Sequence, residues 1–366
     1  MRKLMALLCV TVVVLILSGT EAGAGQKKYK IGIAAGKMGN TWTAQFAEVL
    51  DAGMRKYIAD GIISDYQLAS TDGNVTEQVT QCMTMINSGV DALLIWPVSP
   101  GALQGVVDAA HANGIVVVNY NDLMAYDGVI SIVCDNYAFQ RIQAIWLVER
   151  LNGKGDIVQI TGTPGFSSDD MRQKAAAEVF AKYPGIRILG SAPGNWHTTV
   201  AQQAMTTFLA TYDDIDAVFS QDVMAEGILK AYENAGIEPE VMTGDYTAGF
   251  FRKWVDIPGL DSIGVTNQHS LVINAVDVAL NLLDGKKIKP GVLESNPLNP
   301  ELINMIPVAP AYVVTREGDQ NAPWMQGLVG SRAITLDGTL KLLEGKPDTA
   351  GLDGCMTREE VAQFFE

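Results

Sequence analysis

The chain has 366 residues, of which 48% are hydrophobic and 18% are charged, and these proportions exclude an intrinsically disordered protein. The formal net charge of −15 at pH 7 argues against a protein that binds nucleic acid or anionic lipid, because its surface repels phosphate groups. At this length two hydrophobic cores are expected rather than one.

The first residues have the pattern of an export signal. Arg2 and Lys3 precede an apolar segment over residues 4–17, which is too short for a bilayer-spanning helix of about 20 residues. An A-x-A cleavage sequence then ends at Ala24. We therefore predict a signal peptide over residues 1–24, cleavage after Ala24 and a periplasmic location for the mature protein.

From Lys30 onward, short β-branched runs alternate with amphipathic helical runs. The runs predicted to form strands are residues 30–35, 92–98, 115–121, 129–135, 156–162, 217–222, 240–246 and 262–267. The predicted helices are residues 41–59, 74–87, 100–112, 137–151, 170–183, 198–212, 224–235 and 270–283. Several strand runs are apolar almost throughout, which is typical of parallel strands covered on both faces. The pattern predicts an α/β fold with two doubly wound lobes.

Ligands of doubly wound sheets bind beyond the carboxyl ends of the strands, so the residues that follow each strand are site candidates. All of these candidates except one lysine are tryptophans, amides or carboxylates. They are Lys37, Asn40, Trp42, Trp96, Asn121, Asp122, Asp169, Asp170, Trp196, Gln221, Asp222, Asp245 and Asn267. Carboxylates and amides form directional hydrogen bonds with neighbouring hydroxyls, and a flat aromatic ring packs against the C–H face of a sugar. The set predicts a polyhydroxylated ligand, although Trp96 alone can cover a helix, and Asp122 or Asp222 can cap one.

The loop after the first strand resembles a phosphate-binding loop only in part. The spacing from Gly32 to Gly36 is one residue short of GxxxxGK[ST], and Met38 stands where the hydroxyl residue is required. A catalytic function is not expected either, because the chain has three histidines and no GxSxG, HExxH or dinucleotide-binding motif. We predict no cofactor and no metal.

Three cysteines follow the predicted signal peptide. Cys82, Cys134 and Cys355 do not have the spacing of a zinc site. A disulfide between Cys82 and Cys134 is compatible with an oxidising compartment. We favour the simpler interpretation that both are small buried hydrophobic side chains.

A family resemblance extends from Tyr29 to about Lys289. It is carried by the segments YKIGIAAGKMGNTWTAQFAEVLDAG, SGVDALLIWPVSPGALQGVVDAAHANGIVVVNYND, AKYPGIRILGSAPGNW, DIDAVFSQDVMAEGILKAYENAG and TGDYTAGF. Their order and spacing resemble the periplasmic sugar-binding proteins of ABC importers, in the ribose-binding-like group of type I periplasmic binding proteins. The resemblance implies two Rossmann-like lobes that are joined by a three-segment hinge and close over a ligand in the cleft between them.

The resemblance also implies lobe boundaries and partners. The N-terminal lobe would comprise residues 25–127 and 267–300, and the C-terminal lobe residues 128–266 and 301–316. Residues 317–366 would form an extension that docks on a lobe. The expected partners are a carbohydrate or polyol and the permease of an ABC transporter, with a chemoreceptor as an alternative, and no nucleic acid. A monomer is expected.

For the site, the resemblance implies that Trp42 and Trp196 sandwich a sugar ring. Hydrogen bonds to the hydroxyls would come from Asn121, Gln221, Asp245 and Asn267, while Asn40 shares the ring-stacking loop with Trp42. Lys37 is either a solvated loop charge or a ligand contact.

Ribose-type relatives place arginines where this chain has Asp122 and Asp170. The arginines that grip ring hydroxyls are then missing, which favours a polyol or an amino-bearing sugar over ribose. The chain is similar, more weakly, to autoinducer-2-binding relatives, so such a signal is the alternative ligand.

Two features characterise the C-terminal part. The run NMIPVAPAYVVTREG predicts a crossover strand for the hinge. Asp353, Gly354 and Glu360 fit three positions of a calcium loop, but Thr349 and Gly351 supply no carboxylate, so calcium is rejected. Thr357 and Glu360 instead predict a capping box that starts a short helix.

Overall fold

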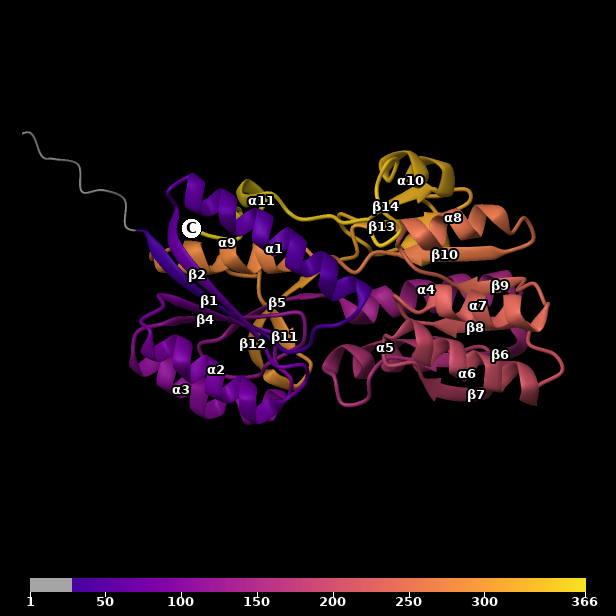
Figure 1. Ribbon diagram of the computed structural model, residues 1–366, viewed down its shortest axis with the longest axis horizontal. Helices are drawn as coiled ribbons and strands as arrows, with labels where there is room; N and C mark the ends of the chain where they lie inside the picture. Colours follow the sequence, from indigo (N-terminus) through magenta and orange to yellow (C-terminus); the bar gives the residue numbers. More distant parts are fainter. Residues whose placement is uncertain (1–27) are drawn as a thin grey trace, which may run out of the picture.

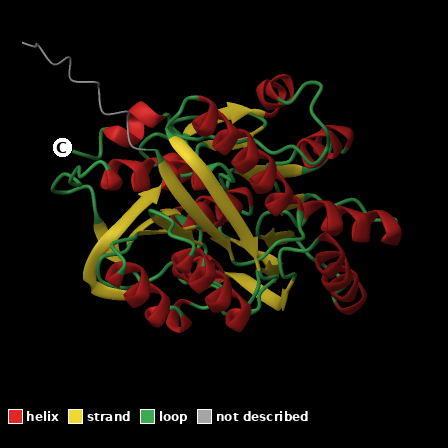
Figure 2. Ribbon diagram, turned by 60° about the vertical axis from the view of Figure 1, so that its left-hand side comes forward, coloured by secondary structure: helices red, strands yellow, loops and turns green. Residues whose placement is uncertain are grey.

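The computed structural model describes residues 28–366, and the predicted signal peptide lies outside this range. Two α/β lobes lie side by side, each built on a seven-stranded, mostly parallel sheet with helices packed against it (Figure 1, Figure 2). This arrangement confirms the predicted fold class. Within the described range, no helix is both long and apolar enough to cross a membrane.

The first sheet contains strands from both ends of the described chain. Its order is β11 (Glu294–Asn296), β12 (Asn299–Val308), β5 (Ile130–Cys134), β4 (Val116–Tyr120), β3 (Ala92–Ile95), β1 (Tyr29–Ala35) and β2 (Ile63–Ser70). The pairing is parallel except between β11 and β12. The helices of this lobe are α1 (Thr41–Ala59), α2 (Val75–Asn87), η1 (Pro100–Ala102), α3 (Gln104–Ala112), α9 (Leu271–Leu283) and α11 (Arg358–Ala362).

The second sheet has the same size and a similar order. Its strands are β14 (Arg332–Thr335), β13 (Tyr312–Thr315), β10 (Asp261–Val265), β9 (Val241–Thr243), β8 (Ala217–Ser220), β6 (Lys154–Thr161) and β7 (Gly185–Pro193). Only the pair β10–β13 is antiparallel. The helices are α4 (Asn136–Arg150), α5 (Ser167–Phe180), α6 (Thr198–Thr211), α7 (Ala225–Ala235), α8 (Ala248–Asp256), η2 (Pro323–Met325) and α10 (Leu336–Leu342).

The structure moves two of the predicted lobe boundaries. β5 pairs in parallel with β4 and with β12, so it belongs to the first lobe, whereas the prediction began the second lobe at residue 128. For the same reason, residues 301–308 of β12 belong to the first lobe and not to the second. Hydrophobic periodicity identifies a buried strand but does not specify which sheet it joins, because both sheets accept the same apolar pattern.

Three crossings between the lobes form the predicted hinge, and the C-terminal tail adds a fourth. The chain passes between lobes at residue 135, at residues 266–270 and at residues 309–311. The predicted crossover run therefore contains two strands, β12 and β13, one in each sheet. Residues 343–357 then lead from α10 on the second lobe back to α11 on the first (Figure 1).

The tail contacts both lobes rather than one. In the second lobe, the Leu352 amide donates to the Tyr246 carbonyl oxygen at 2.9 Å. In the first lobe, the Asn274 side-chain amide donates to the Met356 carbonyl oxygen at 2.8 Å. The predicted capping box is confirmed at the start of α11, where Thr357 and Glu360 cap each other's backbone amides. In the part of the chain that the structure describes, no cluster of His, Cys, Asp or Glu is arranged to hold a metal.

The cysteines follow the simpler interpretation. Cys82 and Cys134 are buried and free, and burial raises the pKa of both thiols to about 12. Both therefore remain protonated and pack as small hydrophobic side chains.

Candidate binding site between the lobes

Side chains from both lobes and from the hinge line one cavity at the carboxyl ends of the strands. The lining residues are Lys37, Asn40, Trp42, Thr43, Trp96, Asn121, Asp122, Asn136, Phe166, Ser168, Arg172, Trp196, Asp222, Val223 and Asn267. Nine of the thirteen site candidates are among them, and Asp169, Asp170, Gln221 and Asp245 are not. The strand-end rule therefore located the cavity, since both sheets direct their carboxyl ends to the interface.

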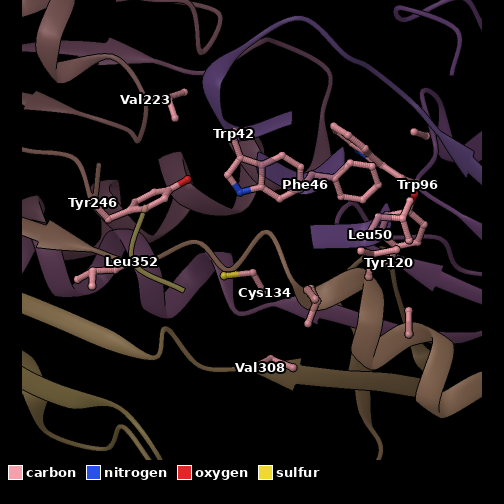
Figure 3. Close-up of a cluster of buried hydrophobic side chains, with 14 of the residues drawn as sticks. Trp42, Phe46, Leu50, Trp96, Tyr120, Cys134, Val223, Tyr246, Val308 and Leu352 are labelled. Atoms are coloured by element: carbon pink, nitrogen blue, oxygen red, sulfur yellow. The ribbon is translucent and has the colours of Figure 1, made fainter. Parts of the chain in front are cut away.

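Trp42 forms the wall on the side of the first lobe. Its ring stacks on Phe46 at a centroid distance of 5.7 Å and meets Trp96 edge-on at 5.5 Å (Figure 3). The indole nitrogen of Trp42 donates to the Asn267 carbonyl oxygen at 3.0 Å, so the ring also contacts the hinge. Because only 6% of Trp42 is exposed, this residue belongs to the core as much as to the cavity.

Trp196 forms the wall on the side of the second lobe and is less deeply buried than Trp42. Its ring lies edge-on to Phe166 at 5.8 Å, and its indole nitrogen donates to Oε1 of Gln221 at 2.8 Å. A Cβ atom on Gly162 would lie 2.3 Å from the Trp196 ring, so only glycine at the end of β6 allows the ring to occupy this place.

The backbone takes the left-handed conformation at several cavity positions. Asn121, Trp196 and Val223 have φ angles of 68°, 52° and 58°. Asparagine tolerates this region, but it is a genuine outlier for a β-branched residue such as Val223. Such strain is characteristic of functional sites, where the surrounding structure stabilises it.

Arg172 is the most important cavity residue that the sequence analysis missed. It lies on α5, is only 2% exposed and forms a buried ion pair with Asp222. Its Nε donates to Oδ1 of Asn136 at 2.8 Å, and its guanidinium lies 4.2 Å from the centroid of the Phe139 ring. The prediction that the cavity lacks an arginine is therefore wrong. Arg172 lies only two residues beyond Asp170, but its orientation depends on the packing of α5.

Asp222 connects the two lobes through the hinge. One carboxylate oxygen accepts from Arg172, and the other accepts from the Asn267 side-chain amide at 2.8 Å. Asn267 lies on the second crossing. The ion pair, the hinge and the cavity wall therefore share one network of hydrogen bonds.

Asn40 and Asp122 are largely committed to protein partners. Oδ1 of Asn40 caps α1 by accepting from the Thr43 amide at 2.9 Å, and its Nδ2 donates to the Trp196 carbonyl oxygen at 3.3 Å. The Asp122 carboxylate accepts from Nε1 of Trp96, from the Ser167 hydroxyl and from the Ser168 amide, at 2.8, 3.0 and 2.9 Å. Asp122 therefore has the donors that a buried carboxylate requires.

The site candidates outside the lining have different environments. Asp170 is exposed on the first turn of α5, and its pKa is raised by partial burial and by the neighbouring Asp169 and Asp122. Gln221 lies behind Trp196, and its Nε2 donates to Oδ1 of Asp169 at 2.6 Å. Asp245 is buried and accepts from the Tyr246 amide at 2.7 Å.

Asp245 is expected to make the stability of the protein depend on pH. Burial, and then the charge of Asp222, raise its pKa from 3.8 to about 7. The folded protein then binds more protons than the unfolded chain between these two values, so the free energy of unfolding falls as pH rises through this window. We expect the free energy of unfolding of the wild type to fall by an amount on the order of 1–3 kcal/mol between about pH 5 and pH 8. Asp245→Asn, whose side chain has the same shape, should not show this fall.

Urea unfolding of the wild type and Asp245→Asn at the two pH values tests this expectation. Asp277, whose pKa burial raises to about 6, is present in both proteins and therefore cancels in the comparison. Parallel changes with pH in the two proteins would contradict the role of Asp245.

Comparisons with known proteins give consistent matches. A family model described as a periplasmic binding protein domain matches residues 31–287. The xylitol-binding protein of Mycolicibacterium smegmatis is 33% identical over 170 residues, which cover 46% of this chain and 49% of that protein. The chain thus aligns with about half the length of this relative.

Two further matches cover more of the chain. The ribose import binding protein of Bacillus subtilis is 25% identical over 268 residues, which cover 72% of this chain and 85% of that protein. The crystal structure of an ABC transporter solute-binding protein from Thermobispora bispora is similar in fold, with a TM-score of 0.73 and 21% identity. This match covers 92% of this chain and 94% of that one.

Proposed function

Because the chain belongs to the periplasmic binding protein family, we propose that it captures a sugar or sugar-like polyol between its lobes and delivers it to the permease of an ABC transporter. The observation that carries this proposal is the cavity at the lobe interface, which has tryptophans from both lobes among its lining residues. A ligand in this place contacts both lobes at once, so its binding energy favours the closed arrangement.

The lining suits the two kinds of surface that a sugar or polyol presents. The rings of Trp42, Phe166 and Trp196 offer apolar faces to C–H groups. Asn121 and Asn136 offer amide groups, and Arg172 offers guanidinium donors, to hydroxyls. The combination of both kinds of contact in one cavity is typical of small-molecule sites.

The charges favour a neutral ligand over an amine. Asp122 has three donors from the protein, and Asp222 accepts from Arg172 and Asn267. Neither carboxylate therefore needs a ligand ammonium to offset its burial. Since Asp170 lies outside the lining, the sequence-based argument for an amino-bearing sugar no longer has support. We propose a pentose or a pentitol, in line with the relatives named for ribose and xylitol.

A ligand screen by thermal unfolding tests the proposal. Ribose, xylitol, glucose and glucosamine are added separately at the same concentration. A ligand that binds only the folded state adds RT ln(1 + [L]/Kd), which is about 4 kcal/mol at 1,000 times Kd. We expect a neutral pentose or pentitol to raise the midpoint most and glucosamine to raise it least. A larger shift with glucosamine would contradict the neutral ligand, and no shift with any of the four would contradict the proposed ligand class.

Export and the choice of partner are separate parts of the proposal. The charged and apolar pattern of residues 1–24 supports export to the periplasm. Secretion into the periplasmic fraction, lost when residues 1–24 are deleted, tests this part. We propose a permease rather than a chemoreceptor as the partner, because the matched solute-binding protein is named as a component of an ABC transporter.

A further inference from the structure

The contacts of Asp122 and Ser167 indicate that these residues have a role in the cleft other than binding the ligand. We propose that these two residues form a latch that stabilises the closed arrangement of the lobes, whichever ligand is bound. The ligand-dependent part of its test rests on the proposed function.

Most of the hydrogen bonds of Asp122 cross between the lobes. Asp122 follows β4 in the first lobe and is 2% exposed. One carboxylate oxygen accepts from Nε1 of Trp96, in the same lobe, at 2.8 Å. The other oxygen accepts from the hydroxyl of Ser167 at 3.0 Å and from the amide of Ser168 at 2.9 Å, and both donors lie in the second lobe. Two of its three donors are therefore available only when the lobes are together.

The Ser167 hydroxyl both donates and accepts a hydrogen bond between the lobes. It donates to Asp122 and accepts from the backbone amide of Leu123 at 2.9 Å, which also lies in the first lobe. This single hydroxyl thus completes two hydrogen bonds between the lobes. If it is removed, the buried Leu123 amide has no acceptor at this place in the closed state, and such a buried group is unfavourable.

Asp122 also supplies the cap for a helix of the other lobe. α5 lies at the edge of the second lobe that faces the first (Figure 1). Its N-cap position is Phe166, which makes no side-chain cap hydrogen bond in the described structure. The first amides of a helix lack partners within the helix and carry partial positive charge, so a carboxylate is favourable there. Asp122 provides that carboxylate from the opposite lobe.

The latch consists of protein atoms only, so its contribution to closure does not depend on which ligand occupies the cavity. When the binding-competent state is partly populated, the apparent affinity falls in proportion to that population. Loss of the latch should therefore weaken every ligand by the same factor. Loss of a direct ligand contact would instead weaken ligands unequally, according to which hydroxyl each one places there.

The first experiment measures affinity by calorimetry for the wild type, Ser167→Ala, Asp122→Ala and the double variant. With ribose, xylitol and glucose as probes, Ser167→Ala should weaken each ligand that binds by the same factor, about fivefold to tenfold. The effects of the two substitutions should be less than additive in the double variant, because both remove the hydrogen bond between Ser167 and Asp122. Unequal factors among the ligands, or additive effects of the two substitutions, would overturn the latch.

Thr335→Ala is the matched control. The Thr335 hydroxyl caps α10 of the second lobe by accepting from the Gly338 amide at 3.0 Å. Its loss should lower the midpoint of thermal unfolding, as the loss of a helix cap does. It should leave every ligand affinity unchanged, because closure does not involve this cap.

The second experiment needs no ligand. Hydrogen exchange of the Leu123 amide should be faster in ligand-free Ser167→Ala than in the ligand-free wild type. The reason is that the substitution removes the hydroxyl that accepts the hydrogen bond of this amide. Equal exchange in the two proteins would overturn the latch. If the wild type binds none of the three probes, the proposed function fails, while the exchange comparison still decides the latch.

Discussion

Replacing Arg172 by glutamine is expected to lower the free energy of unfolding by about 3–5 kcal/mol and to abolish ligand binding, because it leaves Asp222 buried without its charge partner. Arg172 and Asp222 are 2% and 3% exposed and form an ion pair. The substitution also removes the donor to Asn136 and the guanidinium over Phe139. Urea unfolding and calorimetric titration measure the two effects.

Two further variants separate charge from packing. The double variant Arg172→Gln/Asp222→Asn should recover part of the lost stability, because it leaves no unpaired buried charge. Arg187→Gln breaks an ion pair with Asp156 in which the arginine side chain is 70% exposed, and it should leave the unfolding midpoint nearly unchanged. A loss below about 1 kcal/mol in Arg172→Gln would contradict the role assigned to the buried pair.

The two tryptophans of the cavity should respond differently to alanine. Trp42→Ala is expected to lower the free energy of unfolding by about 3–5 kcal/mol, because it leaves a void beside Phe46 and Trp96 in the core. Trp196→Ala should mainly weaken binding, by about 2 kcal/mol, because Trp196 is only partly buried and lines the cavity. Both substitutions should reduce affinity if the rings pack on the ligand.

Thermal unfolding without ligand and titration with the ligand found in the screen distinguish the two effects. Trp42→Phe, which keeps most of the buried ring, serves as the control and should lose less stability than Trp42→Ala. Equal stability losses in the two alanine variants would contradict the assignment of Trp42 to the core. Unchanged affinity in both would contradict the packing of these rings against the ligand.

The elements that sequence patterns predicted best are those with the strongest local signal. The α1 helix has the predicted bounds, since it begins at a capping box of Asn40 and Thr43. Strands β2 and β7 were not predicted. Both lie at sheet edges, and half or more of their residues are partly or fully exposed, so they lack the continuous apolar run that marks a buried strand. Helix α8 was also missed, because its residues lie between two predicted strands where no element was assigned.

The amino-acid sequence by itself determined the α/β class, the strand ends that line the cavity and nine of its side chains. These features follow from local periodicity and from a general rule about parallel sheets. Only the tertiary structure decided that β5 joins the first lobe, that Arg172 reaches the cavity and that Asp122 bonds to Ser167, which lies 45 residues away in the chain. The orientation of a side chain that could bond to several donors depends on the packing of segments that are distant in the chain, and no local pattern contains that information.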